Sequence, residues 1–406
     1  MSSRTLLALA LLVYITHAED WPQWRGPRLD GRSAETTFPT KWTKTEGVLW
    51  RTELPGEGHA SVITHGNKLF TVAAVPETQE RLLLCLNRAD GKIRWQQPVL
   101  KAPMERLHRE NSHASSTPAT DGERVFCTFL DRDTAVAAAY DFAGKQLWLK
   151  RLGPFSSVHG FCSTPMLFRD TIIINCDHDG DGYIVALARQ DGAERWRIAR
   201  PNKTRSYVAP LIREAGGRWQ MVLAGTKCVA SYDPATGAPL WMIDGPTDQF
   251  VASAVWHQKA GLFFVTGGFP DHHLLAIKPG GSGNITGSDF IAWHGRQGVA
   301  YVPSPIAEGD WFFITDDRGF GHCFDAATGA ERWEQRMGRQ HASLVSAGGL
   351  LYFLNDDGIC HVVRAGEKYQ LVAKNELGEP TYASPALSEG QLFLRSEKHL
   401  YCIEAR

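Results

Sequence analysis

Short runs of apolar residues, each bounded by turn residues, recur along the chain and predict β-strands throughout. Examples lie at residues 125–129, 171–175, 262–266, 311–315 and 350–354, and these runs are rich in β-branched and aromatic side chains. No stretch shows apolar residues at the three- and four-residue spacing of an amphipathic helix. The pattern therefore predicts an all-β protein.

A recurring phrase divides these strands into units. It consists of a polar turn that contains glycine and, four residues after the glycine, a tryptophan in a short strand, as in Gly91 and Trp95. Copies of the phrase end at Trp95, Trp148, Trp196, Trp241, Trp293 and Trp333. The copy before Trp293 is degraded, and the spacings are 40 to 53 residues. A unit of this length holds about four short strands, which is the size of one β-propeller blade.

A second sequence feature, here called the landmark, precedes each phrase and indicates the number of units. It is a small residue, often followed by proline, at the start of another strand. The landmarks are Ser61, Thr117, Thr164, Ala209, Ala254, Ser304, Ser343 and Ser384. Eight landmarks predict an eight-bladed propeller.

The two ends of the chain predict how the ring closes. The last unit stops at residues 400–404 without a tryptophan strand, whereas a surplus strand with Trp50 lies at residues 48–54. Pairing the two would leave no exposed sheet edge. The tryptophans could form a set that stacks on a ligand, but their regular positions favour wedges between neighbouring blades. In the seventh unit Val372 and Ala373 occupy that position.

The amino terminus has the pattern of a secretory signal. Arg4 precedes a ten-residue apolar run at 6–15, and Ala18 lies at the expected cleavage site. The alternative is an ordinary buried helix, and ten residues are too few to span a membrane. We expect a signal peptide at 1–18, an extension that packs on the propeller at 19–46, and the propeller at 47–406. The mature protein would then be periplasmic or otherwise extracytoplasmic, with no transmembrane segment.

The net charge bears on the kind of partner, and the cysteine positions bear on disulfide formation. A formal net charge of −1 without any basic run argues against a nucleic-acid partner. Cys85, Cys323 and Cys402 occupy one strand position in three units, as small buried apolar residues would. Cys162 and Cys176 flank a turn, and either a disulfide or two free thiols is compatible with their spacing.

The Asp/Asn-x-x-x-Gly-x-x-x-Trp phrase resembles the repeat of pyrroloquinoline-quinone-like propellers. That family includes quinoprotein alcohol dehydrogenases and the BamB-type outer-membrane assembly factor. Residues 21–27 (Trp-Pro-Gln-Trp-Arg-Gly-Pro) and 277–285 resemble segments of exported planctomycete-type members. The resemblance implies an eight-bladed propeller, with pyrroloquinoline quinone or Ca²⁺ as conceivable cofactors. The chain lacks the adjacent cysteine pair and the Cys-x-x-Cys-His haem site of the dehydrogenases, and the lipid-anchoring cysteine of BamB-type proteins.

The innermost strands supply candidate ligand-binding residues at the mouth of the central channel. In each landmark the small residue is followed by a second position, which is often proline. Three residues before that second position, the eight units hold His59, Ser115, Cys162, Tyr207, Ala252, Val302, His341 and Tyr382. Because units seven, eight and one are neighbours in a ring, His341, Tyr382 and His59 should lie side by side. His113 should reach the same region. The candidate ligand set is therefore His59, His113, Tyr207, His341 and Tyr382, in which imidazoles could bind a metal or carry protons. The alternative is plain channel lining.

A second candidate site is the sequence Asp177-His178-Asp179-Gly180-Asp181-Gly182. Asp177, Asp179 and Asp181 alternate like the first ligands of a calcium loop, but the twelfth position is Ala188 rather than an acid. An ordinary Asp/Gly-rich β-turn is the alternative.

Two functions are compatible with these observations. The first is an exported, non-catalytic binding or scaffold propeller that engages protein or polysaccharide through its loops and channel mouth. The alternative is a quinone- or metal-dependent oxidoreductase with its site at the channel mouth. The chain contains neither a Gly-x-Ser-x-Gly nucleophile turn nor a His-Glu-x-x-His motif, which favours the first. The oligomeric state stays open.

Overall fold

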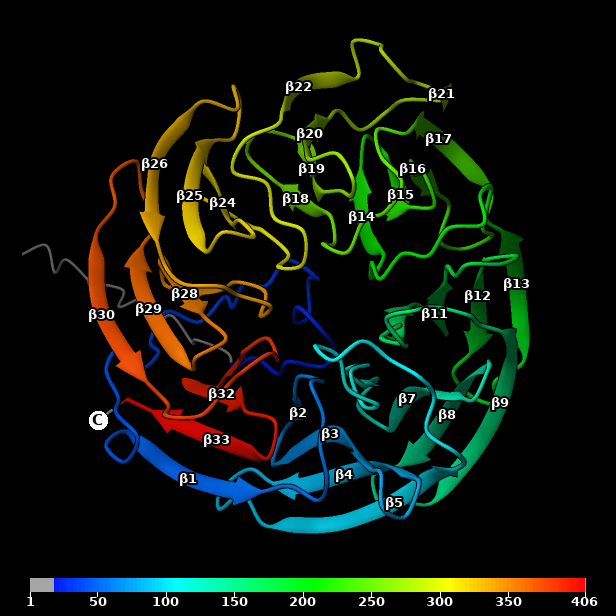
Figure 1. Ribbon diagram of the computed structural model, residues 1–406, viewed down its shortest axis with the longest axis vertical. Helices are drawn as coiled ribbons and strands as arrows, with labels where there is room; N and C mark the ends of the chain where they lie inside the picture. The colour runs from blue at the N-terminus through cyan, green and yellow to red at the C-terminus, as the bar shows by residue number, and fades with distance from the viewer. Residues whose placement is uncertain (1–17, 406) are drawn as a thin grey trace, which may run out of the picture.

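A ring of eight sheets, antiparallel except for one short added strand, surrounds a central axis (Figure 1). The computed structural model describes residues 18–405, and the regular secondary structure in that range consists of β-strands alone. None of the described residues forms a helix with the length and hydropathy needed to cross a membrane. The predicted all-β, eight-bladed propeller is confirmed. The predicted signal peptide lies almost wholly outside the described residues.

The first four blades follow one another along the chain. Blade 1 comprises β2 (Ile63–His65), β3 (Lys68–Val75), β4 (Glu80–Asn87) and β5 (Ile93–Lys101). Blade 2 comprises β6 (Ala119–Thr120), β7 (Arg124–Asp131), β8 (Thr134–Asp141) and β9 (Gln146–Pro154). Blade 3 comprises β10 (Met166–Phe168), β11 (Thr171–Cys176), β12 (Tyr183–Ala188) and β13 (Glu194–Ala199). Blade 4 comprises β14 (Leu211–Ala215), β15 (Arg218–Gly225), β16 (Cys228–Tyr232) and β17 (Pro239–Asp244).

The remaining blades complete the ring, and two of them depart from the simple order. Blade 5 comprises β18 (Val255–His257), β19 (Leu262–Gly267), β20 (His273–Ile277) and β22 (Ile291–Gly295), and its inserted β21 (Gly283–Asn284) joins the edge of blade 4. Blade 6 comprises β23 (Ile306–Glu308), β24 (Trp311–Thr315), β25 (Phe320–Asp325) and β26 (Glu331–Arg336). Blade 7 comprises β27 (Val345–Ala347), β28 (Leu350–Leu354), β29 (Ile359–Arg364) and β30 (Leu371–Glu376). Blade 8 comprises β31 (Ala386–Ser388), β32 (Gln391–Arg395), β33 (His399–Glu404) and β1 (Val48–Glu53).

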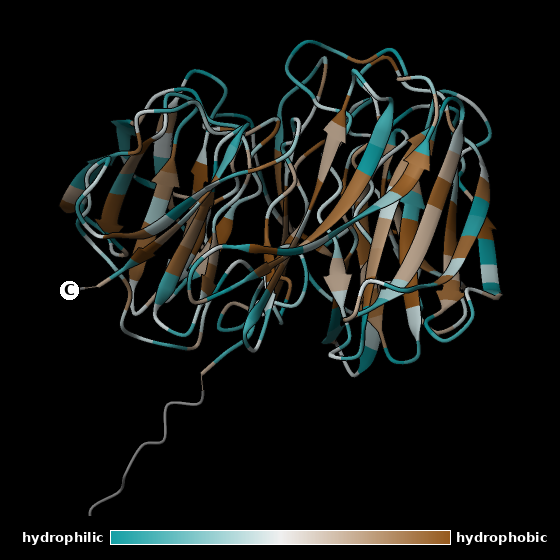
Figure 2. Cartoon of the chain, turned by 90° about the horizontal axis from the view of Figure 1, so that it is seen from below, coloured by the Kyte–Doolittle hydropathy of each residue, from teal (hydrophilic) through white to brown (hydrophobic). Residues whose placement is uncertain are grey.

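Burial along the strands explains the apolar pattern of the sequence. The middle strands of a blade, such as β11 and β12, are buried at every residue because neighbouring blades cover both of their faces. The outermost strand alternates instead, as in β13, because only one side of it packs inward. In the side view, hydrophobic residues follow the strands and hydrophilic residues dominate the loops at both ends (Figure 2). The core is therefore the set of spaces between blades.

The tryptophan and the glycine of the repeat contact each other across adjacent blades. The Trp95 indole donates a hydrogen bond to the Phe142 carbonyl in the next blade (3.0 Å), beside Gly144. A Cβ at Gly144 would lie 3.0 Å from that indole, and the glycine also has a positive φ of 86°. Trp50, Trp148, Trp293 and Trp333 make the same hydrogen bond to the next blade. The interpretation of these tryptophans as wedges is confirmed.

The amino-terminal strand closes the ring. β1 pairs antiparallel with β33, and Trp50 lies opposite Cys402. In the same way Cys85 lies opposite Trp95 and Cys323 opposite Trp333, which explains why one small residue recurs at this position. All three cysteines are fully buried.

Glu379 adds an ionic contact to this closure. Its carboxylate accepts hydrogen bonds from Ser396 (2.6 Å) and Tyr401, interacts with His399 (2.8 Å), and forms an ion pair with Arg51 of β1. Burial opposes the charge, but these four groups together lower the pKa of Glu379 to about 2.

This pKa makes the closure sensitive to acid. The unfolded chain has a glutamate pKa of about 4.3, so the stabilisation is complete above that pH and is lost as the pH falls toward 2. We expect Glu379→Gln to lower the free energy of unfolding by about 1–2 kcal/mol at pH 7, after allowance for solvent screening. The difference from wild type should shrink between pH 5 and pH 3 in urea denaturation. A difference independent of pH would contradict the ionic role.

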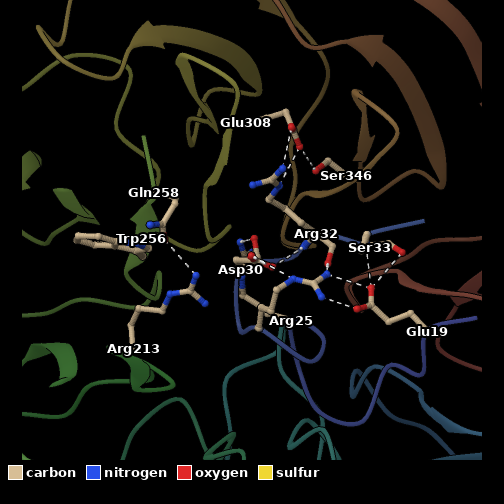
Figure 3. A network of polar contacts seen from close by, with 12 residues as sticks. Glu19, Arg25, Asp30, Arg32, Ser33, Arg213, Trp256, Gln258, Glu308 and Ser346 are labelled. Atoms are coloured by element: carbon tan, nitrogen blue, oxygen red, sulfur yellow. Dashed lines mark hydrogen bonds and ion pairs between the residues drawn. The ribbon is translucent and has the colours of Figure 1, made fainter. Parts of the chain in front are cut away.

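Residues 19–33, here called the plug, lie across one end of the ring axis. Thr64 of β2, Thr120 of β6 and Leu167 of β10 donate backbone hydrogen bonds to the plug. On the opposite side the Arg25 guanidinium, 3% exposed, donates to the backbone carbonyls of Ser304, Pro305 and Leu344. Figure 3 shows the neighbouring pair of Arg32 with Glu308 (2.9 Å). Because the plug bonds to blades on both sides of the axis, it holds the inner strands together.

The cysteine pair near the third blade is not bridged. Cys162 and Cys176 are both free. The Cys162 thiol lies near the Tyr207 carbonyl (3.9 Å), whereas Cys176 packs in the core beside Tyr183. A disulfide between them is therefore wrong for this structure, because the two side chains lie in different surroundings.

Candidate functional site

A pocket of about 410 Å³ lies on the axis at the end of the ring opposite the plug, and we call it the channel-mouth pocket. Seven of the eight predicted inner-strand residues line it, including His59, Tyr207, His341 and Tyr382. In blade 5 Val251 takes the place of Ala252, which is fully buried. Trp24 of the plug also lines the pocket, so the plug closes its inner end.

The small landmark residues hold these inner strands at a regular spacing. The Ser61 amide donates to the Thr117 hydroxyl of the next blade (2.9 Å). The same kind of bond joins Ala209 to Ser253, Ser253 to Ser304, Ser304 to Ser343, and Ser343 to Ser384. In blade 5 this hydroxyl comes from Ser253, which precedes the landmark Ala254, whereas Ala209 of blade 4 takes part through its amide alone. The backbone around the pocket is thereby ordered.

One group of side chains comes from blades 7, 8 and 1. The His59 and Tyr382 rings lie 4.5 Å apart between centroids, and His341 meets Tyr382 edge-on at 5.3 Å. Asp356 accepts hydrogen bonds from the His341 backbone amide (2.9 Å) and from Nδ1 (2.8 Å). With Nδ1 bonded in this way, Nε2 is the nitrogen left for the pocket. The predicted grouping of His341, Tyr382 and His59 is confirmed.

The environment keeps His59 neutral over most of the acid range. Burial lowers the pKa of His59 to about 4, and the nearby charges of Arg395 and His341 act in the same direction. Its backbone amide donates to the Ser112 hydroxyl (2.9 Å). His59 is thus a neutral hydrogen-bonding group at physiological pH rather than a cation.

A second group lies on the side of blades 3 and 4. The Tyr207 hydroxyl contacts Ser157 Oγ (2.6 Å) and His159 Nδ1 (2.8 Å), and burial raises the pKa of Tyr207. The His108 ring lies edge-on to His159 at 5.3 Å. The Asn111 amide donates to the His159 carbonyl (2.6 Å). Tyr207 therefore belongs to the pocket but lies apart from His341 and Tyr382.

A charged pair joins the loop between β5 and β6 to the connection between blades 6 and 7. Arg339 donates two hydrogen bonds to the Glu110 carboxylate, at 2.7 and 3.1 Å. This pairing lowers the pKa of Glu110. Within the pocket lining Arg339 is the one arginine or lysine and Glu110 the one carboxylate, so the rim carries almost no net charge.

His113 is not part of the pocket lining. Its ring lies between Glu57 (Nδ1 to Oε1, 3.2 Å) and the Glu105 carbonyl (Nε2 to O, 2.9 Å). Although burial opposes the positive charge, Glu57 and Glu105 raise the pKa of His113. The expectation that His113 joins the other candidates is wrong, because both of its ring nitrogens contact groups that lie outside the pocket lining.

The three aspartates of the predicted calcium loop are not brought together. Asp177 is fully buried and pairs with Arg200 (2.8 Å), which also has a fully buried side chain. Asp179 pairs with Arg205 and exposed Asp181 with Lys203, both at 2.8 Å. Each carboxylate pairs with its own cation, so the three do not converge as the ligands of a calcium loop would.

Several pocket residues have no periodic signal in the sequence. Trp24, His108, Asn111, His159 and Arg339 all lie in the plug or in loops between blades. Their positions differ from unit to unit, so alignment of the repeats cannot find them. Of these residues, only Trp24 lies in a recognisable sequence motif, at residues 21–27.

The pocket does not fit pyrroloquinoline quinone. That quinone carries three carboxylates, whereas the single lining guanidinium, Arg339, is already paired with Glu110. A calcium ion takes six to eight oxygen ligands, and Glu110 is the one carboxylate available. The lining suits a largely neutral ligand that stacks on aromatic rings and accepts or donates hydrogen bonds.

These features define the class of the protein: an eight-bladed β-propeller with a pocket at one end of its axis and a plug at the other. The chain belongs to the pyrroloquinoline-quinone-like repeat family whose model is described as outer membrane protein assembly factor BamB, which matches at residues 42–214, 81–335 and 225–369.

Solved structures show the same fold. BamB from Moraxella catarrhalis is 13% identical, with a TM-score of 0.60, and the match covers 87% of this chain and 98% of that one. A europium-containing methanol dehydrogenase is 11% identical, with a TM-score of 0.56, and the match covers 95% and 98%. Identities this low establish the fold alone. No curated protein sequence matches the chain.

Proposed function

We propose that this protein is an exported, non-catalytic binding propeller that holds a segment of another protein in the channel-mouth pocket. The observation that carries the proposal is the shape and chemistry of that pocket. It is open at one end and closed by Trp24 at the other, so it suits a loop or a protruding side chain. Aromatic rings with hydrogen-bonding partners are typical anchors of protein interfaces.

The lining side chains support binding because they are already held in place. His341 is fixed by Asp356, Tyr207 by His159 and Ser157, and Arg339 by Glu110. A preorganised pocket loses little side-chain freedom when a ligand enters. The name of the matching family, an outer membrane protein assembly factor, favours a protein over a polysaccharide as the partner. The predicted signal peptide at 1–18 supports an extracytoplasmic location.

The test is a binding screen with three named probes. Purified protein is titrated with an array of 15-residue peptides of alternating apolar and polar residues, with a soluble β-glucan, and with pyrroloquinoline quinone plus Ca²⁺. We expect binding to a subset of the peptides. Trp24→Ala and Tyr382→Ala should each weaken that binding at least tenfold, because each removes an aromatic contact in the pocket.

Trp219→Ala is the matched control, since Trp219 is 39% exposed and lies outside the channel-mouth pocket. Peptide binding that survives both pocket variants would contradict the proposal. Binding of the glucan alone would replace the protein partner by a polysaccharide. Quinone affinity tighter than millimolar would favour the oxidoreductase instead.

A further inference from the structure

A second cavity, of about 440 Å³, lies away from the axis between blades 5 and 6. His322 of β25 lines this cavity at its buried side, and the His322 side chain is 1% exposed. Glu331 and Glu334 of β26 stand at its edge, with side chains 40% and 44% exposed. This group shares no residue with the channel-mouth pocket.

Local strand geometry places the two glutamates beside the histidine. Glu334 lies directly opposite His322 in the β25–β26 pair. A β-bulge follows, so Glu331 lies opposite Phe324, on the same face as His322. Regular pairing would put Arg332 there instead. The bulge therefore places the Glu331 carboxylate, rather than the Arg332 guanidinium, on the same face as His322.

The distances bring three potential ligand atoms together. His322 Nδ1 lies 2.6 Å from Glu331 Oε1 and 3.8 Å from Glu334 Oε2. One atom from each of these residues lies within 4.8 Å of the other two, and this is the single such group among residues 18–405. Gly298 has a positive φ of 60°, and a Cβ there would lie 3.0 Å from His322 Nδ1. Glycine thus leaves the space above the imidazole nitrogen open.

The second ring nitrogen of His322, Nε2, is buried and makes no hydrogen bond of ordinary distance and angle. The Asp316 carboxylate faces this nitrogen, with Oδ2 at 3.4 Å from Nε2. In metal sites the second nitrogen of a ligating histidine is typically oriented by a carboxylate in this way. Asp316 would play that positioning part if Nδ1 bound a metal.

The charge around the cavity favours a cation. Asp316, Asp317, Glu331 and Glu334 line it, opposed by Arg296 and Arg318. Arg318 contacts Asp316 (2.7 Å) and Glu334 (3.4 Å), but its side chain is 66% exposed and can turn toward solvent. A divalent ion would replace it as the partner of Glu334.

We propose that His322, Glu331 and Glu334 bind a divalent transition-metal ion of the Zn²⁺ type. One imidazole nitrogen and two carboxylate oxygens form a three-ligand site of the kind that Zn²⁺ uses when it keeps a position open. The open position faces the cavity. This proposal is independent of the binding function assigned to the channel-mouth pocket.

The test is isothermal titration of chelator-treated full-length protein with ZnCl₂, with CaCl₂ as comparison. We expect one Zn²⁺ per chain with micromolar or tighter affinity, and much weaker Ca²⁺ binding because an imidazole is a poor calcium ligand. His322→Gln should abolish the binding. Glu331→Gln and Glu334→Gln should each weaken it at least tenfold. Co²⁺ at the same site should give a visible absorption spectrum that His322→Gln removes.

His361→Gln is the matched control. His361 lies on β29 at the same strand position in blade 7 that His322 has in blade 6, but the residue directly opposite it is Lys374 rather than a glutamate. Its zinc binding should equal that of the wild type. Thermal unfolding without metal checks that each variant folds, and the exposed Glu331 and Glu334 variants cover a failure of His322→Gln to fold. Absence of stoichiometric Zn²⁺ binding to the wild type, or equal binding by the glutamate variants, would overturn the proposal and leave a plain ionic cluster.

Discussion

Replacing Trp50 with alanine is expected to lower the free energy of unfolding by about 3–5 kcal/mol, the range for truncation of a large buried aromatic side chain. Trp50 is 8% exposed, packs near the Phe393 ring (6.2 Å between centroids), and donates to the Arg88 carbonyl (2.8 Å). Its ring also lies against Gly91. The variant therefore loses the contact between blades 8 and 1 at the point where the ring closes.

Urea denaturation of the full chain measures this loss, and hydrogen exchange locates it. Amides of β33 should exchange faster in Trp50→Ala, because β1 is the strand that covers that edge. Trp219→Ala, at an exposed site, should lower stability by less than about 1 kcal/mol. Equal effects of the two substitutions would mean that β1 does not hold the ring together.

Replacing Asp177 with asparagine is expected to have a comparable effect, again about 3–5 kcal/mol. The change leaves the Arg200 guanidinium buried without its counter-charge, which is more damaging than loss of the whole pair. Arg200 donates to Asp177 (2.8 Å) and to the Tyr232 hydroxyl (2.6 Å), and Ser206 donates to the second Asp177 oxygen (2.7 Å). Burial opposes the charge of Arg200, but Asp177 raises its pKa.

Asp181→Asn is the matched control in the same loop. The Asp181 side chain is 89% exposed, so solvent screens its pair with Lys203, and Asp181→Asn should leave the free energy of unfolding nearly unchanged. Thermal unfolding of the wild type should also be unchanged by millimolar Ca²⁺. A calcium-dependent rise of the midpoint that Asp181→Asn removes would restore the calcium-loop interpretation.

The repeat phrase illustrates why so much of the fold is predictable. Gly144 and Trp95 belong to different blades, yet each is required by local geometry: the glycine by its positive φ and the tryptophan by the gap beside it. The same requirement arises in most units, so it leaves a periodic trace. His113 and Arg339 lie in loops that occur once, and nothing in the sequence indicates which way their side chains turn.

By itself, the sequence determined the strand content, the number of blades, the closing strand and seven of the eight inner-strand residues that line the channel-mouth pocket. Those properties follow from local conformation and burial, which repeat with every unit. Tertiary structure alone decided which polar groups meet. Asp177 pairs with the buried Arg200, Trp24 closes the inner end of the pocket, and a β-bulge brings Glu331 into contact with His322. Such contacts depend on side-chain directions and on distances between separate segments, and the one-dimensional pattern carries neither.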